Sequence, residues 1–151
     1  NAAVGSGLVV VAAAAAALAE RDYAAADGLN VMATVKAWAS AGVTPRDCGL
    51  GALKAISKVL DRGGLTASDV ALWEINEAFA SVPIAACKEF GLDEELVNFS
   101  GSGCSLGHPI AASGARMVTT LVYELQRRGG GIGVAAMCAG GGQGGAVIIE
   151  V

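Results

Sequence analysis

The chain contains one histidine, His108, which stands between a glycine and a proline in Gly107-His108-Pro109. Further along, Cys138 opens a glycine-rich stretch that runs over residues 138–145. Histidine and cysteine are the side chains whose proton affinities are most easily tuned toward neutral pH. We therefore begin from an acid–base site, with His108 and Cys138 as its candidate residues.

The neighbours of His108 favour a functional role for this residue. Pro109 restrains the backbone of the histidine that precedes it, and a helix pattern follows shortly afterwards. The positive N-terminal end of such a helix would disfavour the imidazolium and keep the ring neutral, ready to accept a proton. The alternative is a histidine that only caps a loop, because a motif built on one histidine is weak by itself.

Cys138 follows an apolar strand pattern and precedes Ala139 and three glycines at 140–142. Glycines there would let the backbone approach a ligand closely and aim N–H groups at an oxyanion. A buried, inert thiol at a hairpin turn explains Cys138 slightly better from the sequence alone. The other cysteines lack such a context and are interpreted as structural, although one of them lies in a glycine-rich loop near the histidine; they are Cys48, Cys87 and Cys104.

Asn76 is the third candidate, because it falls where a predicted strand gives way to a helix. The C-terminal ends of strands are where α/β domains place functional groups. Its amide can both donate and accept, so it could hold a water or a carbonyl oxygen. The alternative, a simple helix N-cap, is a common role for asparagine and is favoured when the residue is considered alone.

Composition narrows the class of protein. The 151 residues suit one domain with a sizeable core, and 54% are hydrophobic while only 16% are charged. Either the core is large or much surface is buried against another domain or subunit. With 10 Lys and Arg against 14 Asp and Glu, there is no basic stripe, which disfavours nucleic acid as a partner. The first residue is Asn rather than Met, which indicates a fragment or a processed product.

Several other functions are disfavoured by missing patterns. The longest apolar run, at 8–19, is too short to span a bilayer and follows no basic residue, so neither a membrane span nor a signal peptide is expected. There is no Cys-x-x-Cys pair for zinc, and free thiols in a reducing, cytosolic setting are expected. The glycine runs lack the spacing of nucleotide-binding loops.

Hydrophobic periodicity predicts interleaved strands and helices, and hence an α/β layered domain. The last two strands read as an antiparallel hairpin in the centre of the sheet, because they are apolar on both faces. A capping box is expected at 66–69 and a glycine-rich loop at 100–107. The expected strands are 8–11, 31–39, 70–75, 96–99, 132–137 and 146–151, and the expected helices are 12–21, 51–62, 77–90 and 113–128.

Three separated motifs, taken in order, resemble the thiolases. They are Asn-Glu-Ala-Phe at 76–79, Gly-His-Pro at 107–109 leading into Ala-Ser-Gly-Ala-Arg at 112–116, and Cys-Ala-Gly-Gly-Gly at 138–142. The resemblance covers essentially the whole chain and is specific because of the order. It implies that residues 1–151 form a thiolase-like C-terminal domain, a mixed central sheet with helices on both faces, without the N-terminal half that carries the nucleophile.

The resemblance also implies a chemistry and the residues that perform it. Thiolases join two acetyl-CoA molecules into acetoacetyl-CoA, or cleave a 3-ketoacyl-CoA with CoA, through an acyl-enzyme on a cysteine. His108 would activate that cysteine and help bind the thioester oxygen, and Cys138 would be the acid–base that moves the α-proton. Asn76 would fix a water in one oxyanion hole, and Gly140 would donate its N–H in a second. Ala78 and Phe79 would line the pantetheine tunnel. No metal or other cofactor is implied, since coenzyme A thioesters are the substrates.

The chain departs from the thiolase pattern in three places. No part of it resembles the half that carries the acylated cysteine, so the chain alone is expected to be inactive. Ala111 stands where a glycine is usual, and 101–105 differ from the usual glycine-alanine loop. The expected ligands are acyl-CoA and CoA, and the expected protein partners are an N-terminal thiolase half and further copies of the full-length enzyme in a dimer or tetramer. The expected location is the cytoplasm, and the expected role is in fatty acid and lipid metabolism.

Other members of the superfamily fit less well. Ketoacyl synthases use two histidines, and this chain has one. Sterol-carrier-type thiolases carry His-Asp-Cys-Phe where this chain has Asn-Glu-Ala-Phe, and the trifunctional type has His in place of Asn76. A non-catalytic CoA-binding or dimerisation domain remains as the alternative, although such a module would not need Asn76, His108 and Cys138 together.

Overall fold

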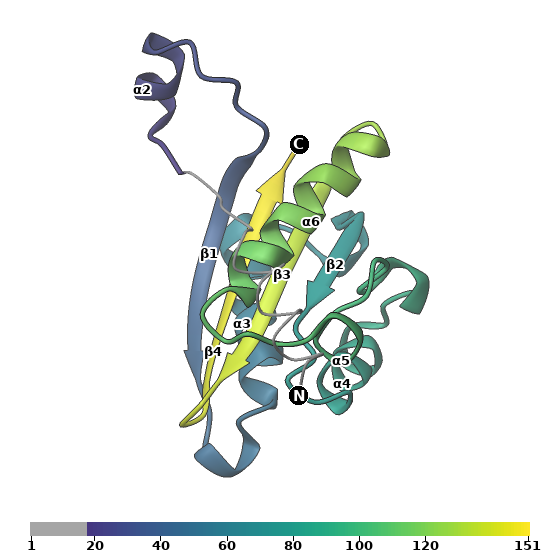
Figure 1. Cartoon of the computed structure of the whole chain (residues 1–151). Helices are drawn as coiled ribbons and strands as arrows, with labels where there is room; N and C mark the ends of the chain where they lie inside the picture. The colour runs from purple at the N-terminus through teal and green to yellow at the C-terminus, as the bar shows by residue number, and fades with distance from the viewer. Residues whose placement is uncertain (1–17) are drawn as a thin grey trace.

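The computed structural model describes residues 18–151, and its centre is a four-stranded mixed sheet (Figure 1). The strands lie in the order β1-β4-β3-β2. β2 runs parallel to β3, whereas β3 with β4 and β4 with β1 are antiparallel. The bounds are β1 Thr34–Gly42, β2 Leu72–Ile75, β3 Ile132–Ala139 and β4 Gln143–Glu150.

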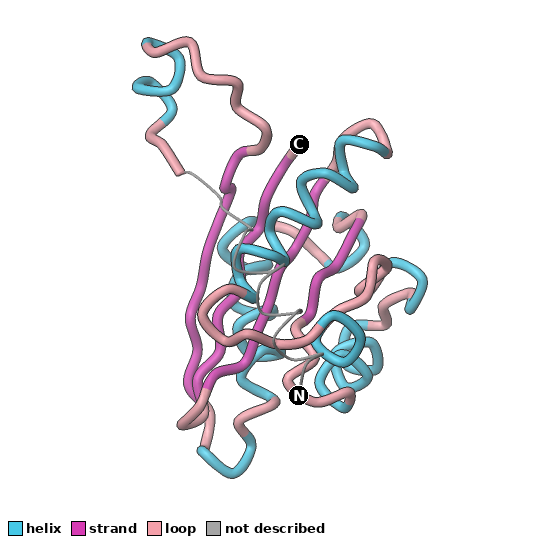
Figure 2. Tube along the Cα trace, in the orientation of Figure 1, coloured by secondary structure: helices cyan, strands magenta, loops and turns pink. Residues whose placement is uncertain are grey.

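Two amphipathic helices cover opposite faces of this sheet. α3 (Leu50–Gly63) packs on β1, β4 and β3, and α6 (Ser113–Arg127) packs on β3 and β2. Figure 2 shows both helices beside the strands, with the loops gathered at the ends of the sheet. The shorter helices are α2 Arg21–Ala26, α4 Ser81–Phe90 and α5 Gly103–Leu106, and the 3-10 turns are η1 Pro45–Asp47, η2 Ala67–Asp69 and η3 Glu94–Leu96.

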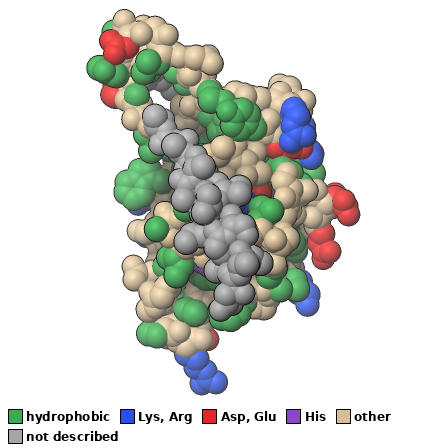
Figure 3. All heavy atoms as spheres, in the orientation of Figure 1, with side chains coloured by type: hydrophobic (Ala, Val, Ile, Leu, Met, Phe, Trp, Pro, Cys, Tyr) green, Lys and Arg blue, Asp and Glu red, His purple; other side chains and the backbone are tan. Residues whose placement is uncertain are grey.

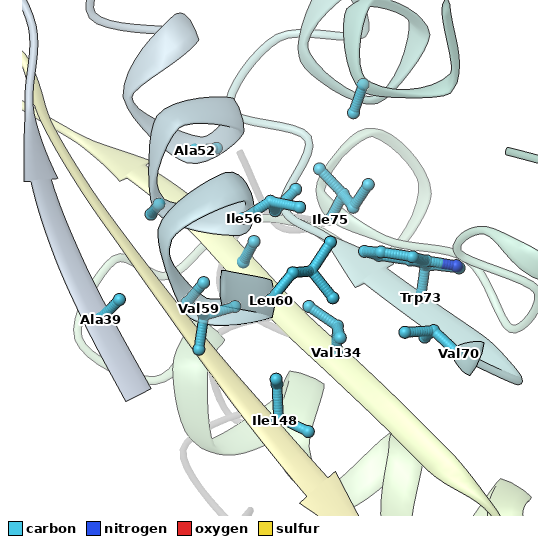
Figure 4. Close-up of a cluster of buried hydrophobic side chains, with 14 of the residues drawn as sticks. Ala39, Ala52, Ile56, Val59, Leu60, Val70, Trp73, Ile75, Val134 and Ile148 are labelled. Atoms are coloured by element: carbon cyan, nitrogen blue, oxygen red, sulfur yellow. The ribbon is translucent and has the colours of Figure 1, made fainter. Parts of the chain in front are cut away.

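The core has two parts, one on each face. On the α3 side, Ile56, Val59 and Leu60 of the helix meet Val134 and Ile148 of the central strands (Figure 4). On the other side, α6 lays Met117, Leu121, Val122 and Leu125 onto Leu72, Ala135 and Ile149. Burial of a large aliphatic side chain is worth roughly 2 kcal/mol, so this double layer fixes the strand ends from which the site residues emerge.

Most of the predicted elements are confirmed. The helices predicted at 51–62 and 113–128 and the strands predicted at 31–39 and 70–75 are present with bounds shifted by a few residues. The C-terminal hairpin is antiparallel and supplies the two central strands. Gly64 ends α3 in the left-handed conformation, and Thr66 and Asp69 form the expected capping box. The strand predicted at 8–11 and most of the helix predicted at 12–21 lie outside the described residues, while residues 18–20 are irregular.

Three predictions are wrong in detail. The helix predicted at 77–90 begins only at Ser81, because Pro83 lacks an N–H and fits a first turn but not a helix interior. Residues 96–99 form no strand, and Val97 makes one isolated parallel bridge to Trp73. The loop predicted at 100–107 contains α5, which begins with a Ser102–Ser105 capping box.

One close contact sets the position of α3 on the sheet. A Cβ at Gly144 would overlap the Gly51 carbonyl, and a Cβ at Gly51 would overlap the Gln143 carbonyl. Both positions therefore need glycine for space, and the backbones of α3 and β4 touch directly. Within residues 18–151, no helix is both long and apolar enough to cross a membrane.

Candidate active site

The site begins where β2 ends. The ladder between β2 and β3 pairs Ile75 with Ala136, and the Asn76 N–H continues it by donating to the Ala136 carbonyl at 2.9 Å. The Asn76 side chain is fully buried. Because the neighbouring parallel strand holds its backbone, Asn76 has a fixed position at the carboxyl edge of the sheet.

His108 meets Asn76 in this position. The Asn76 Nδ2 and His108 Nε2 atoms lie 3.2 Å apart, and the His108 Nδ1 and Ser113 Oγ atoms lie 2.7 Å apart. Ser113 is the first residue of α6, and its hydroxyl donates to the Pro109 carbonyl at 3.2 Å. The connection from α5 to α6, which carries His108, crosses near the ends of β2 and β3 in Figure 1.

These contacts fit one tautomer of the histidine. When the single proton of the Ser113 hydroxyl goes to the Pro109 carbonyl, the hydroxyl oxygen accepts from Nδ1–H. Nε2 is then the unprotonated nitrogen of the neutral ring, and it accepts from the Asn76 amide. A ring nitrogen with its lone pair at the site edge can accept a proton from an incoming acid.

The other half of the Asn76 amide is unsatisfied. Asn76 Oδ1 is buried and has no hydrogen-bond partner among residues 18–151. A buried acceptor without a partner costs about 1–3 kcal/mol, so its persistence indicates a water or a ligand group there. This is the behaviour expected of a residue that holds a water beside His108.

A buried ion pair lies behind these residues. Arg116 of α6 donates to Glu74 at 2.5 Å and to the Ser102 hydroxyl at 3.1 Å, and Glu74 and Ser102 are fully buried. Burial raises the pKa of Glu74 to about 7, and the Arg116 guanidinium offsets only part of that effect. The nearby Glu77 carboxylate raises the pKa of Glu74 further.

A second set of polar contacts fastens the segment around α5. The Glu77 carboxylate accepts from the Cys104 backbone N–H at 2.8 Å and from the Asn98 side chain at 3.3 Å. The Asn98 amide also binds both the N–H and the carbonyl of Ile75, each at 2.8 Å. Asn98 therefore occupies the free edge of β2 as a strand would, and it holds a left-handed backbone with φ 52° to do so.

Cys138 lies at the same edge of the sheet but on the other side of it. It is near the end of β3, two residues beyond Ala136, and it packs against the α3-side core. Burial raises the pKa of its thiol, and the neighbouring Cys48 raises it further. Among the described residues, no hydrogen bond joins Cys138 to Asn76 or His108, so the structure brings together two of the three predicted catalytic side chains.

The remaining predicted residues surround this edge. Gly140 lies in the turn between β3 and β4, and its carbonyl accepts from the Gln143 side chain at 3.1 Å. A Cβ at Gly140 would meet nothing within 4 Å, so open space adjoins it. Ala78 is half-buried and Phe79 is 66% exposed, in the bend between β2 and α4.

The sequence reasoning missed several residues of this site. Ser113 and Arg116 stand in the motif that follows Gly-His-Pro, but neither was given a role. Glu74 was missed because an acidic residue inside an apolar strand gives no sign of its partner. The position of Glu74 in an otherwise apolar strand could have predicted a buried partner, because burying a lone carboxylate is costly and implies a nearby cation.

Comparisons with known proteins identify the family of the chain. The family model described as "Thiolase, C-terminal domain" matches residues 29–151. The chain is 46% identical to an acetyl-CoA acetyltransferase of Escherichia coli over 138 residues, which are 91% of this chain and 35% of that protein. The chain thus spans about a third of the length of the curated relatives it matches.

Solved structures give the same result. Human mitochondrial 3-ketoacyl-CoA thiolase matches with a TM-score of 0.84 and 39% identity, covering 87% of this chain and 34% of the human one. The Acat5 thiolase from Ascaris suum, solved in complex with coenzyme A, matches with a TM-score of 0.83 and 42% identity, over 87% of this chain and 34% of that one. The chain belongs to the thiolase family, and its matched region is the C-terminal domain of that family.

Proposed function

We propose that this chain, over residues 1–151, is the C-terminal catalytic half of a thiolase. Together with an N-terminal half, it would transfer acyl groups between acyl-CoA and CoA, by Claisen condensation of acetyl-CoA and by the reverse thiolysis. The observation that carries the proposal is the buried Asn76–His108 contact with an unsatisfied Asn76 Oδ1 beside it. A domain that only bound CoA or formed a dimer, the alternative function, would not need that contact.

His108 would act in two stages. Its unprotonated Nε2 would first accept the proton of a nucleophilic cysteine on the N-terminal half, which leaves a thiolate that can take the acyl group. The protonated Nε2 would then donate to the thioester oxygen as the enolate forms. The Nδ1–H contact to Ser113 supports this order, because it leaves proton acceptance to Nε2, whose contact with the Asn76 amide would have to give way when the proton arrives.

Asn76 would supply the second donor of that oxyanion hole through a water on its amide. Each such donor is worth roughly 3 kcal/mol of transition-state stabilisation. Gly140 would contribute its N–H to a separate hole for the tetrahedral intermediate, and the open space beside it supports this role. Phe79, which is exposed, and Ala78 would contact the pantetheine arm of CoA.

Cys138 would be the acid–base that removes the α-proton of acetyl-CoA or protonates the departing CoA thiolate. Its raised pKa keeps the thiol protonated near neutral pH, which suits the acid role directly. For the base role, the thiolate is scarce but strongly basic. His108 and Cys138 would both have to reach the same acetyl group at this edge of the sheet, because one stabilises its oxygen and the other moves its α-proton.

An apolar groove on the surface of the described residues supports the proposal that an N-terminal half packs against this chain. It lies between the first turns of α6 and the α6-side face of β1, β3 and β4, with a volume of about 310 Å³. Trp38 lines it and is 65% exposed. On the face seen in Figure 3, charged side chains lie mainly around the rim of the described surface. We propose that the N-terminal thiolase half covers this groove.

The proposed function includes the substrates, the metabolic setting, the location and the oligomeric state of the enzyme. The substrates would be CoA thioesters with no further cofactor, and the setting would be fatty acid and lipid metabolism. We propose a cytoplasmic location and a homo-oligomeric full-length enzyme, a dimer or tetramer. One relative, from Mus musculus, is named as a cytosolic acetyl-CoA acetyltransferase, and it is 44% identical to this chain over 138 residues.

Reconstitution tests the proposal. The purified 151-residue chain is mixed with the N-terminal half of a thiolase, and CoA-dependent cleavage of acetoacetyl-CoA is measured. We expect no turnover by either half alone and turnover by the mixture. A mixture that forms a stable complex and binds CoA without any turnover would favour the non-catalytic alternative.

A further inference from the structure

Two buried ionisable side chains are not used by the proposed chemistry. Glu74 is fully buried and Arg116 is 8% exposed, and they form an ion pair. The Arg116 guanidinium also donates to the buried Ser102 hydroxyl, so it joins β2, α6 and the start of α5 through directional bonds. Arginine suits such a junction because its N–H groups have a rigid, planar arrangement.

The place of this junction connects it to His108. Glu74 is two residues before Asn76, on the same face of β2. Arg116 is one helical turn after Ser113, on the same side of α6. Two cross-links therefore run in parallel between β2 and α6: the ion pair, and the chain of contacts from Asn76 through His108 to Ser113.

The polar character of the junction indicates a role in geometry rather than in stability. Apolar side chains of similar volume often stabilise a fold as well as a buried ion pair does. Apolar contacts, however, tolerate small sliding of a helix over a sheet, whereas directional hydrogen bonds do not. A shift of the first turn of α6 would break the 2.7 Å contact between Ser113 and the imidazole.

We propose that Glu74, Arg116 and Ser102 form a positioning unit for His108, which fixes the first turn of α6 against β2 and so holds the imidazole as the Nδ1–H tautomer facing Asn76. None of the three touches the imidazole, so they are positioning residues. This role rests on the proposed function only in that His108 is the reacting group there.

The single histidine allows a direct test that does not depend on activity. Nitrogen-15 NMR of the 151-residue chain observes one imidazole, because His108 is the only histidine. In the unsubstituted chain we expect a protonated Nδ1 with a slowly exchanging proton, and an unprotonated Nε2. In Glu74→Ala, which leaves Arg116 without its acceptor on β2, we expect loss of the slowly exchanging Nδ1–H signal and averaging of the two nitrogen shifts between tautomers.

Two further variants separate positioning from folding. Glu124→Gln removes a buried carboxylate that pairs with Arg127 and Arg128 at the other end of α6, and it should leave the His108 signals unchanged. The double variant Glu74→Leu with Arg116→Met replaces the ion pair by apolar volume and keeps the fold, which circular dichroism checks. It should still lose the Nδ1–H signal.

Two results would overturn the proposal. One is a slowly exchanging Nδ1–H in the folded double variant, equal to that of the unsubstituted chain. The other is an unsubstituted chain whose imidazole already averages between tautomers. Neither depends on acyl transfer, so a failure of the proposed function in the reconstitution assay would be recognised separately.

Discussion

His108 is held through both ring nitrogens, and each contact has a different consequence. The Ser113 contact lies at Nδ1 and favours a proton there, and the Asn76 contact lies at Nε2, the nitrogen that we propose exchanges a proton. Substitution of Ser113 by alanine would remove only the first contact. Hydrogen-bond contacts thus link Ser113, His108 and Asn76 in series. Among the described residues, Asn76 Oδ1 at the end of this series has no partner.

The raised pKa of Cys138 predicts the pH dependence of α-proton removal. Below that pKa the thiolate fraction rises tenfold per pH unit, so exchange of the acetyl-CoA methyl protons with deuterated solvent should rise with pH and not level off below pH 8. The measurement is made on the reconstituted enzyme, and Cys138→Ser should lower the rate by about 10² to 10⁴. Cys87→Ser, on α4, is the control and should leave the rate unchanged; a pH-independent rate in the unsubstituted protein would contradict this role for Cys138.

Glu74 predicts a pH dependence of folding stability. Its pKa of about 7 in the folded chain exceeds the ordinary 4.5, so the folded state binds the proton more tightly than the unfolded state does. Its contribution is therefore fully present below pH 4.5 and is lost as the pH rises toward 7, by about 3 kcal/mol. Urea unfolding at pH 5 and pH 8 should show this loss.

Glu74→Gln removes the titrating group while it keeps an acceptor for Arg116, so the difference in unfolding free energy between pH 5 and pH 8 should shrink. Glu89→Gln, an exposed residue on α4, is the matched control and should keep the full difference. Equal pH dependence in the unsubstituted chain and in Glu74→Gln would show that the Glu74 pKa is not raised.

Among the elements, α3 is placed by direct backbone contact with β4. Gly144→Ala would drive a methyl group into the Gly51 carbonyl, so α3 must shift, and we expect a loss of about 3 kcal/mol in the free energy of unfolding. Gly145→Ala, the next residue on the same strand, meets nothing within 4 Å and should change stability by less than about 0.5 kcal/mol. Urea midpoints that fall equally in both variants would contradict the close contact.

The same elements explain how much could be predicted from the sequence. α3 and α6 have strong helical periodicity and clear C-terminal signals, so their extents were predicted closely. The start of α4 was predicted too early. The apolar pattern continues to the N-terminal side of Pro83, but a proline fits only the first turn of a helix, so α4 begins at Ser81. Hydrophobic periodicity shows which face of a helix is buried, whereas the residues at which the helix begins and ends depend on individual backbone hydrogen bonds.

The residues of the site likewise divide into those that the sequence motifs predicted and those that they did not. His108 and Asn76 were predicted because residue type and motif order point to them, and the structure places them in contact. Glu74 and Arg116, 42 residues apart, were not paired in advance because nothing in the local sequence links them. Tertiary packing alone brings them together.

Residues 18–151 of the molecule expose apolar surface that a complete enzyme would cover. The groove beside α6 and the exposed Trp38 predict that the isolated chain associates with itself in solution. Sedimentation velocity measures this directly, and Trp38→Lys should shift the distribution toward the monomer. A stable, soluble monomer of the unsubstituted chain would contradict it.

We propose that Asn76 and His108 form the oxyanion and proton-transfer site of a thiolase half. The most direct test is acetoacetyl-CoA cleavage by the reconstituted halves, with Asn76→Ala compared with Gln126→Ala, an exposed amide distant from the site. We predict a fall of about 10² to 10³ in turnover for Asn76→Ala, with near-UV circular dichroism unchanged, and full turnover for Gln126→Ala. Full turnover by Asn76→Ala, or turnover by the 151-residue chain without its partner half, would contradict the account.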